Sequence, residues 1–102
     1  MRDLLWTMAS SEVYLGRGQR INSISPGAVS TGILEDFKSA FGDRMTRNVE
    51  RAGRAGTAKE VAYLAAFLLS PESGWIKGAD ISIDGGMSAF NNADALGLSD
   101  IL

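Results

Sequence analysis

The sequence predicts an α/β fold with a parallel sheet, and three observations lead to this class. A short apolar segment at residues 20–25 and an alternating one at residues 79–83 are typical of strands. A clear amphipathic helix pattern at residues 57–69 lies between them. A strand, a helix and a second strand in this order form a βαβ unit, whose strands run parallel. Because two strands do not make a stable sheet alone, we expect the chain to be part of a larger fold.

The first element is an amphipathic helix over Arg2–Leu15. Its apolar residues are separated by polar ones: Leu4, Leu5, Met8 and Leu15. Gly16 and Gly18 then end the helix. Residues 20–25 follow, with Ile21 and Ile24 as the buried positions of a strand that Pro26 and Gly27 terminate.

The middle of the chain is less regular. Residues 33–41 show a second helical pattern, with four apolar side chains on one side: Ile33, Leu34, Phe37 and Phe41. Residues 42–56 are rich in Arg and Gly with weak periodicity, which predicts a loop or a mobile helix.

The best-defined element is the helix that follows. Thr57 and Glu60 have the spacing of a capping box, in which each side chain accepts a hydrogen bond from a free backbone N–H group of the helix start. Behind them a helical apolar stripe runs to about residue 69, and Pro71 closes the helix. The stripe consists of Val61, Leu64, Ala65 and Leu68.

The last strand is predicted at residues 79–83. Ala79, Ile81 and Ile83 share one face and Asp80 and Ser82 the other, which suits a strand at a sheet edge or one facing a partner. Residues 84–86 are a turn, and residues 87–102 are a tail whose apolar residues we expect to pack on another surface.

Composition excludes several classes of function. The 102 residues contain no Cys and no His, which removes disulfides, thiolate or imidazole metal ligands, Cys nucleophiles and Ser-His-Asp triads. The carboxylates show no metal-loop spacing, so no metal site is expected. A net charge of −2 with scattered Lys and Arg argues against a nucleic-acid surface. No apolar run approaches the ~20 residues of a membrane span, and we expect a soluble cytoplasmic protein that binds no membrane.

Most of the motifs that could carry chemistry have a structural interpretation. Gly16 and Gly18 precede a strand instead of following one and lack the third glycine of a dinucleotide fingerprint, so we interpret them as turn residues. Neither Tyr14 nor Tyr63 has a Lys four residues later. Asp84, which precedes two glycines, is interpreted as a turn residue.

The stretch SPGAVSTG at residues 25–32 is different. A strand that ends in Pro26 and Gly27 presents its last backbone groups at the carboxyl edge of the sheet, where ligands bind in open α/β folds. Gly27 leaves room for a flat group near the backbone. The loop also offers free backbone groups and the hydroxyls of Ser30 and Thr31, which suit an amide or a phosphate.

Two blocks of the sequence resemble the C-terminal portion of short-chain dehydrogenases/reductases. They are RINSISPGAVSTG and, after an insertion, GRAGTAKEVAYLAAFLLSPESGWIKGADISIDGG. The blocks cover residues 20–87 in the order and at about the separation that the family shows. The tail is weakly similar to the subgroup of hydroxysteroid and coniferyl-alcohol dehydrogenases.

The resemblance implies a C-terminal fragment of a Rossmann-like, doubly wound parallel sheet, with about two strands and three helices in this chain. It divides a single partial domain, residues 1–102, into a nicotinamide loop (20–32), a substrate lid (33–56), the last helix and strand (57–86) and a tail (87–102). Pro26 and Gly27 would form the floor under the nicotinamide. The backbone of Val29 would bind the carboxamide, and the Thr31 hydroxyl would bind the carboxamide or a nearby phosphate.

The resemblance also implies partners. Ile33, Leu34 and Phe37 would fall in the lid over a small alcohol or ketone substrate. The region from Thr57 to Ile83 would form an interface of a homo-oligomer. The cofactor would be NAD or NADP, and the residue that selects between them is not among the matched motifs.

The family's catalytic Ser, Tyr and Lys have no counterpart at matching positions of this sequence, so no catalytic residue is assigned. We expect the C-terminal part of an NAD(P)-dependent oxidoreductase that interconverts a secondary alcohol and a ketone, or a primary alcohol and an aldehyde. On its own the chain is expected to be inactive. Two alternatives stay open: a non-catalytic interaction module that pairs with a full-length relative, and an inactive truncated gene product.

Overall fold

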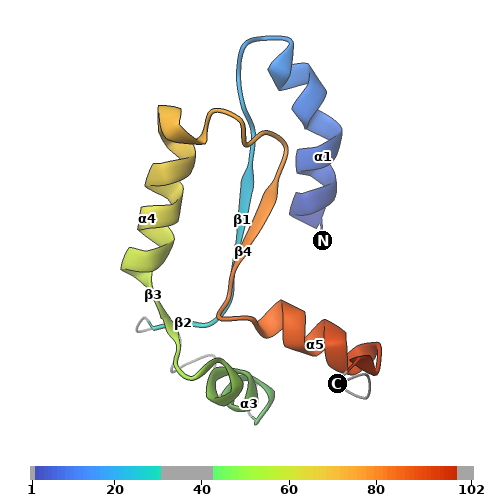
Figure 1. Cartoon of the computed structure of the whole chain (residues 1–102), viewed down its shortest axis with the longest axis vertical. Coiled ribbons are helices and arrows are strands. Elements are labelled where there is room, and N and C mark those ends of the chain that lie inside the picture. The colour runs from blue at the N-terminus through green and yellow to red at the C-terminus, as the bar shows by residue number, and fades with distance from the viewer. Residues whose placement is uncertain (1, 31–42, 99–102) are drawn as a thin grey trace. The chain divides into compact units, whose positions relative to one another are not determined.

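The computed structural model describes residues 2–30 and 43–98 (Figure 1). Its elements in chain order are α1 (Arg2–Leu15), β1 (Ser23–Pro26), β2 (Val29–Ser30), α3 (Asp43–Ala52), β3 (Gly56–Thr57), α4 (Ala58–Leu69), the 3-10 helix η1 (Pro71–Ser73), β4 (Asp80–Ile83) and α5 (Met87–Ala95). The described residues fall into two compact units. One contains those up to Ser25 together with Lys59–Ser82, and the other contains those of Pro26–Ala58 and Ile83–Leu102.

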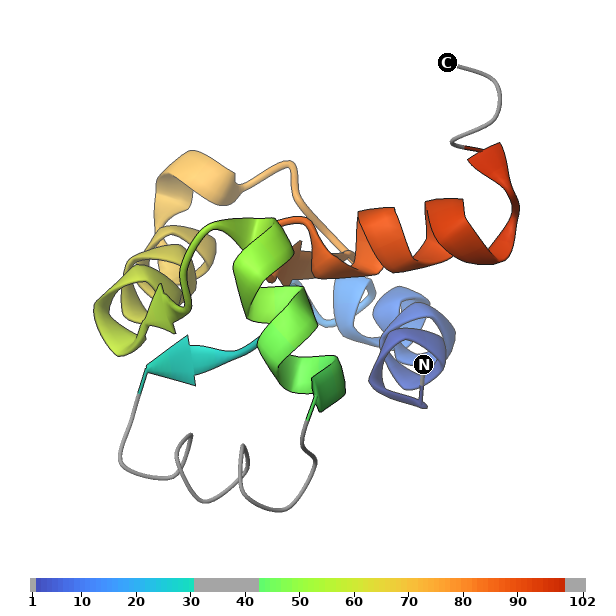
Figure 2. The same ribbon diagram turned by 90° about the horizontal axis from the view of Figure 1, so that it is seen from below.

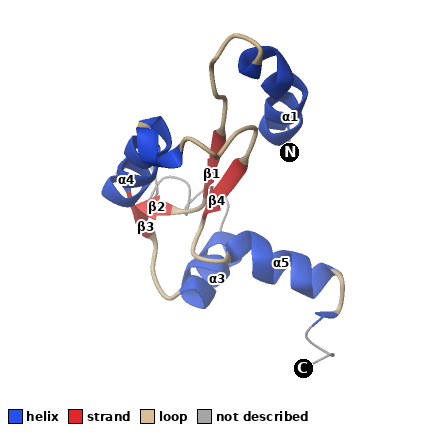
Figure 3. Cartoon of the chain, turned by 45° about the horizontal axis from the view of Figure 1, so that its top comes forward, coloured by secondary structure: helices blue, strands red, loops and turns tan. Residues whose placement is uncertain are grey.

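The first unit is built on the pair of strands β1 and β4. The N–H of Gly78 donates to the Ile21 carbonyl at 2.8 Å, and the N–H of Ser23 donates to the Ala79 carbonyl at 2.8 Å. The partners advance together along the chain, so the strands are parallel. Helices α1 and α4 flank the strands on opposite sides (Figures 1 and 3). This confirms the predicted α/β class with parallel strands.

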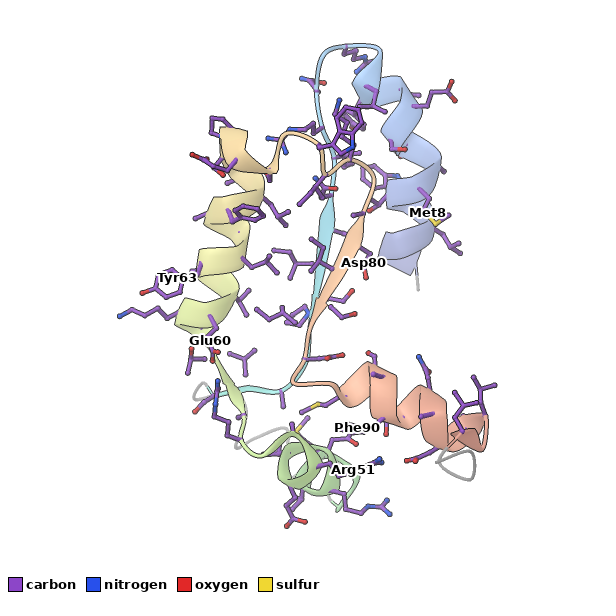
Figure 4. The ribbon with its side chains drawn as sticks, in the orientation of Figure 1. Met8, Arg51, Glu60, Tyr63, Asp80 and Phe90 are labelled. Atoms are coloured by element: carbon purple, nitrogen blue, oxygen red, sulfur yellow. The ribbon has the colours of Figure 1, made fainter. Side chains whose placement is uncertain are left out.

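Helix α4 follows the prediction. Its bounds agree with the predicted helix, and the predicted apolar stripe is its inner face: Val61, Leu64 and Ala65 are half-buried and Leu68 is buried. The opposite side of the helix carries Tyr63, which is 64% exposed and points away from the strands (Figure 4).

Helix α1 has the predicted bounds, but the face that packs on the strands is the opposite of the one expected. Its inner face carries Thr7, Ser10, Ser11 and Tyr14, and Thr7 is only 2% exposed. Of the apolar side chains that we expected on the buried face of the helix, those that the structure describes instead point outward. Leu5, Met8 and Leu15 are 58%, 58% and 41% exposed.

The reason is a close approach of α1 to the loop before β4. A Cβ atom on Gly78 would lie 2.9 Å from the Ser11 Cβ, so the helix comes near enough that only small side chains fit between. The strand face beneath α1 is also polar. Ser23 and Ser25 both donate to the Asp80 carboxylate, with Oγ–Oδ1 distances of 2.5 and 3.0 Å. The short polar side chains of α1 therefore suit this face better than leucines would.

The outcome for β4 differs at one position. Ile81 and Ile83 are half-buried and Ser82 is exposed, as the alternating pattern predicts. Asp80, expected on the polar face with Ser82, is half-buried and bonded to β1, and it points toward the α1 side in Figure 4. Its carboxylate is a link between the two strands.

The second unit contains two helices, of which the sequence predicted one only as an alternative to a loop and did not predict the other. Residues 43–52, expected to be a loop or a mobile helix, form α3, and part of the expected tail forms α5. The inner positions of α3 have helical spacing: Met45, Asn48, Val49 and Ala52. The polar Asn48 in this stripe, together with the many arginines, conceals the periodicity. The described residues thus hold four α-helices, whereas two of the about three expected helices fall within them.

The same unit contains a short parallel pair. β2 and β3 pair with Val29 opposite Gly56 and Ser30 opposite Thr57. Two residues per strand give no alternating pattern, so the sequence carries no signal for this pair. The helix predicted at residues 33–41 lies outside the described residues.

Candidate functional site

The candidate site is the loop that follows β1, where the sequence places the nicotinamide-binding residues. Pro26 is exposed, and Gly27, Ala28 and Val29 are half-buried. The N–H of Gly27 donates to the Ile83 carbonyl at 3.2 Å, which fixes the start of the loop against the end of β4. The structure therefore brings three of the four predicted cofactor-binding residues, Pro26, Gly27 and Val29, together on one segment. The fourth, Thr31, lies outside the described residues.

Gly27 is required by a close approach of backbone. A Cβ atom at this position would lie 2.7 Å from the Cβ and 2.9 Å from the Cα of Asp84. Real Cβ atoms do not approach other carbons this closely, so a side chain here would force the two segments apart. The close approach of Asp84 therefore explains why this position holds a glycine.

The backbone of Val29 is oriented by β3. The N–H of Gly56 donates to the Ala28 carbonyl at 2.9 Å, and the ladder pairs Val29 with Gly56. In a parallel ladder, when one residue of a pair donates and accepts the hydrogen bonds between the strands, its partner directs its own N–H and C=O away from the neighbouring strand. One donor and one acceptor of Val29 therefore point away from β3, and this is the pair of groups that a primary carboxamide can bind.

Asp84 organises the turn beside this loop. Its carboxylate accepts hydrogen bonds from the N–H groups of Gly86 and Ser88, both at 3.0 Å, and thereby caps the start of α5. The hydrogen bond from the Ser88 side chain, assisted by backbone N–H groups of the turn, lowers the pKa of the Asp84 carboxyl, although partial burial opposes the shift. The interpretation of Asp84 as a turn residue is confirmed, and its capping role is new.

Helices α3 and α5 are joined by one arginine. The Arg51 guanidinium forms an ion pair with Asp94 and lies 4.1 Å above the centre of the Phe90 ring. Figure 4 shows Arg51 and Phe90 next to each other. A Cβ atom on Gly85, which has a φ of +66°, would lie 2.9 Å from the Ala52 Cβ, so α3 ends directly against the turn that holds Asp84.

The segment just before β1 is held in place by two residues to which sequence reasoning gave no role. Arg20 donates to three carbonyls at the end of α4 and in η1, those of Leu68, Ser70 and Ser73, at 3.3, 3.2 and 2.8 Å. Asn22 donates to the Ile76 carbonyl at 3.0 Å and accepts from the Ala79 N–H at 2.9 Å. The signal was present as the R-x-N of the first quoted block, but its function lies in contacts about 50 residues away along the chain.

The other predicted site residues are not placed. The lid residues Ile33, Leu34 and Phe37 lie outside the described residues. Within residues 2–30 and 43–98 no group of three Asp or Glu side chains gathers as a metal site would require. None of the helices in the described ranges is both long and apolar enough to cross a membrane.

Comparisons with known proteins agree with this geometry. A family model described as enoyl-(acyl carrier protein) reductase matches residues 6–88. A short-chain dehydrogenase/reductase from Botryotinia fuckeliana is 49% identical over 85 residues, which are 78% of this chain and 33% of that protein. A coniferyl-alcohol dehydrogenase from a Pseudomonas strain is 35% identical over 88 residues, 84% of this chain and 34% of its own.

Solved structures give the same answer. The 3-alpha-hydroxysteroid dehydrogenase from another Pseudomonas strain, complexed with NADH, aligns with a TM-score of 0.80 and 36% identity over 88% of this chain and 36% of that one. Levodione reductase aligns with a TM-score of 0.70 and 33% identity over 84% of this chain and 36% of its own. The chain spans about a third of the length of the relatives it matches. With its parallel α/β fold, its Pro-Gly loop and these matches, the chain belongs to the short-chain dehydrogenase/reductase family.

Proposed function

We propose that this chain forms one wall of the nicotinamide site in an NAD(P)-dependent oxidoreductase. The reaction would interconvert a secondary alcohol and a ketone, or a primary alcohol and an aldehyde. The observation that carries the proposal is that the N–H and C=O of Val29 point away from β3, on a loop fixed at Gly27 and at Ala28. The NADH bound to the related hydroxysteroid dehydrogenase, and the NADP bound to a structure described as a 2-deoxy-D-gluconate 3-dehydrogenase from Agrobacterium tumefaciens, support a nicotinamide ligand.

The residues of this loop fit the nicotinamide end of such a cofactor. A carboxamide has one acceptor oxygen and an NH₂ donor, which match the N–H and C=O of Val29. A bound nicotinamide dinucleotide supplies the hydride chemistry itself. The contribution of this chain is to bind the carboxamide and hold the ring in one orientation, with Pro26 and Gly27 beneath it. Thr31 and the lid residues would complete the same wall.

The chain alone is proposed to be inactive. Binding and orientation do not transfer a proton, and no residue of this chain is assigned as the acid or base of the reaction. The purified chain, mixed with NADH and a panel of ketones, should therefore oxidise no cofactor above the rate without protein. Clear NADH oxidation by the chain would overturn this part of the proposal.

The site itself is tested by the backbone donor of Val29. NADH is titrated into the isotopically labelled chain at millimolar concentration, and the amide resonances of residues 27–30 should shift. Val29→Pro removes the donor and should abolish the response, whereas Val29→Leu keeps the donor and serves as the matched control. The Gly56 amide should be unchanged in both variants, because the Val29 N–H points away from β3. Equal responses of the two variants would show that the Val29 backbone does not bind the nicotinamide.

A homo-oligomer through the region from Thr57 to Ile83 is part of the same proposal. It is supported by large apolar side chains that are exposed there: Tyr63 at 64%, Phe67 at 44%, Leu69 at 85% and Trp75 at 92%. Side chains of this kind are common at the centres of protein interfaces. Light scattering coupled to size exclusion should give a mass above that of a monomer, and Phe67→Ser should reduce it.

A further inference from the structure

Asp84 is the aspartate of this chain that precedes a glycine, and the two residues have the chemistry to react with each other. The Gly85 backbone nitrogen attacks the carboxyl carbon of the Asp84 side chain. The neutral carboxyl group gives up its hydroxyl and the nitrogen gives up its proton, which leave together as water, and a succinimide ring remains. A second water molecule opens the ring, which gives either aspartate again or isoaspartate. Glycine favours the attack because it has no side chain next to the reacting nitrogen.

The fold requires glycine at position 85. Its φ is +66°, and a Cβ atom there would lie 2.9 Å from the Ala52 Cβ. Figure 2 shows the end of α3 beside the turn that leads into α5, where this close approach occurs. Gly85 is exposed, and within residues 2–30 and 43–98 its N–H donates no hydrogen bond. The packing of α3 therefore keeps a reactive pair in the sequence, and the attacking nitrogen is open to solvent.

The other reactant, the Asp84 carboxylate, is held in place. Its Oδ1 accepts from the Gly86 N–H and its Oδ2 from the Ser88 N–H, both at 3.0 Å. Because one of these two oxygens has to leave as water, the reaction breaks at least one of the hydrogen bonds. The hydrogen bond from the Ser88 side chain also lowers the pKa of this carboxyl. The carboxyl is therefore ionised near neutral pH, and a carboxylate is attacked less readily than the neutral acid.

We propose that Asp84 and Gly85 are a modification site that the cap of α5 protects, and that isoaspartate forms there when the carboxylate leaves the cap. The proposal is independent of cofactor binding. In isoaspartate the main chain runs through the Cβ and the carboxyl carbon of the former side chain, so it is one carbon longer. The Asp84 Cβ, from which a Cβ on Gly27 would lie only 2.7 Å away, would then be a main-chain atom. The modification would therefore remove the cap of α5 and change the contact with the loop after β1.

The test is the uptake of oxygen from water. Ring opening adds one oxygen atom from the solvent, so the chain is incubated in water that carries a heavy oxygen isotope, both folded and in urea. The chain is then digested, and fragment masses locate the label. In urea Asp84 should take up label, whereas Asp80, which precedes the β-branched Ile81, should take up little. In the folded chain Asp84 should be labelled at least roughly tenfold more slowly, because a hydrogen bond to a charged group has to break first.

Variants of Ser88 identify the protecting bonds. Ser88→Pro removes the N–H and the hydroxyl together, and proline is tolerated in the first turn of a helix. It should raise the labelling rate of Asp84 in the folded chain by about tenfold. Ser88→Thr keeps both groups and is the matched control, with an expected change of less than about twofold. Circular dichroism compares the helix content of both variants with that of the native chain.

Three results would each overturn the proposal. Absence of label at Asp84 in urea would show that the pair does not form the ring. Equal labelling of the native chain when folded and in urea would show that the cap does not protect the pair, and this comparison decides even where Ser88→Pro lowers the helix content. Equal rates for Ser88→Pro and Ser88→Thr in the folded state would show that the groups of residue 88 do not control the reaction.

Discussion

Replacement of Arg20 by Met should destabilise the chain more than any other single loss of charge in the first unit. The Arg20 guanidinium joins the segment before β1 to the end of α4 and to η1. Its two short contacts are to the carbonyl and the Oγ of Ser73, at 2.8 and 2.9 Å. The Leu68 and Ser70 carbonyls lie farther away, at 3.3 and 3.2 Å. Methionine keeps most of the apolar stem and removes only the donors and the charge.

The size of the effect depends on whether the three carbonyls are left without donors. The Ser73 carbonyl also accepts from the Ile76 N–H at 2.9 Å, the Ser70 carbonyl from the Ser73 N–H at 3.3 Å, and the Leu68 carbonyl from the Ser73 hydroxyl at 2.9 Å. Each carbonyl therefore keeps a partner, and the penalty for an orphaned acceptor does not apply. What remains is the loss of charge-assisted hydrogen bonds and of a cation at a helix C-terminus, for which we expect about 2–4 kcal/mol in total.

The assay is urea denaturation followed by circular dichroism, with the free energy of unfolding compared between native chain and variant. Arg17→Met is the matched control, because Arg17 is exposed and only lies 6.0 Å from the centre of the Tyr14 ring. The control should cost less than about 1 kcal/mol. Arg20→Lys keeps the charge but not the planar fork, so it should fall between the two. A cost for Arg20→Met as small as that of the control would refute the bridging role.

Three further predictions concern the second unit. Gly27→Ala should lower the free energy of unfolding by about 1–3 kcal/mol because the new Cβ atom would clash with Asp84. Gly16→Ala is the control, since a Cβ atom there would have no contact closer than 3.5 Å, and it should change the free energy by less than about 1 kcal/mol. Thermal denaturation compares the two variants. The pKa of the Asp84 carboxyl is lowered in the folded chain, so its stabilising effect is present above the pKa of about 4 in the unfolded chain and is lost as the pH falls through the folded pKa. The difference in the free energy of unfolding between the native chain and Asp84→Asn should therefore shrink below about pH 4. A constant difference would contradict the capping role. A double-mutant cycle of Arg51→Met and Asp94→Asn should give a coupling of about 0.2–1 kcal/mol, because both side chains are about half exposed and the pair is screened by solvent; a coupling of zero in low salt would show that α3 and α5 are not joined by this pair.

The sequence predicts the fold well where the pattern of apolar side chains along an element is set only by its packing on the neighbouring element. The stripe of α4 is apolar because it packs on the strands, and the alternation of Ile81, Ser82 and Ile83 reflects the two faces of β4. The same pattern did not predict which face of helix α1 packs on the strands. Large apolar residues of this helix are exposed, and the small residues on its inner face allow the close approach at Gly78. Hydrophobic periodicity finds the helix but does not say which face turns inward when the inner face consists of small polar residues.

The candidate site shows the same division. Pro26 and Gly27 mark the end of a strand on local grounds, and the position of the loop at the carboxyl edge of the sheet follows from the βαβ order. The role of the Val29 backbone was implied only by the family resemblance, because the direction of its N–H and C=O depends on pairing with Gly56, 27 positions along the chain. The reason why residue 27 must be glycine is likewise distant, since it is the backbone of Asp84.

This distant contact links the site to the cap of α5. Asp84 limits the side chain at position 27 through its Cα and Cβ, and through its carboxylate it binds the first N–H groups of α5. A substitution that moved Asp84 would therefore disturb both the loop under the proposed nicotinamide and the start of the helix that Arg51 joins to α3. The glycine and the aspartate are best understood together, because the absence of a side chain at position 27 leaves room for Asp84, whose carboxylate caps α5.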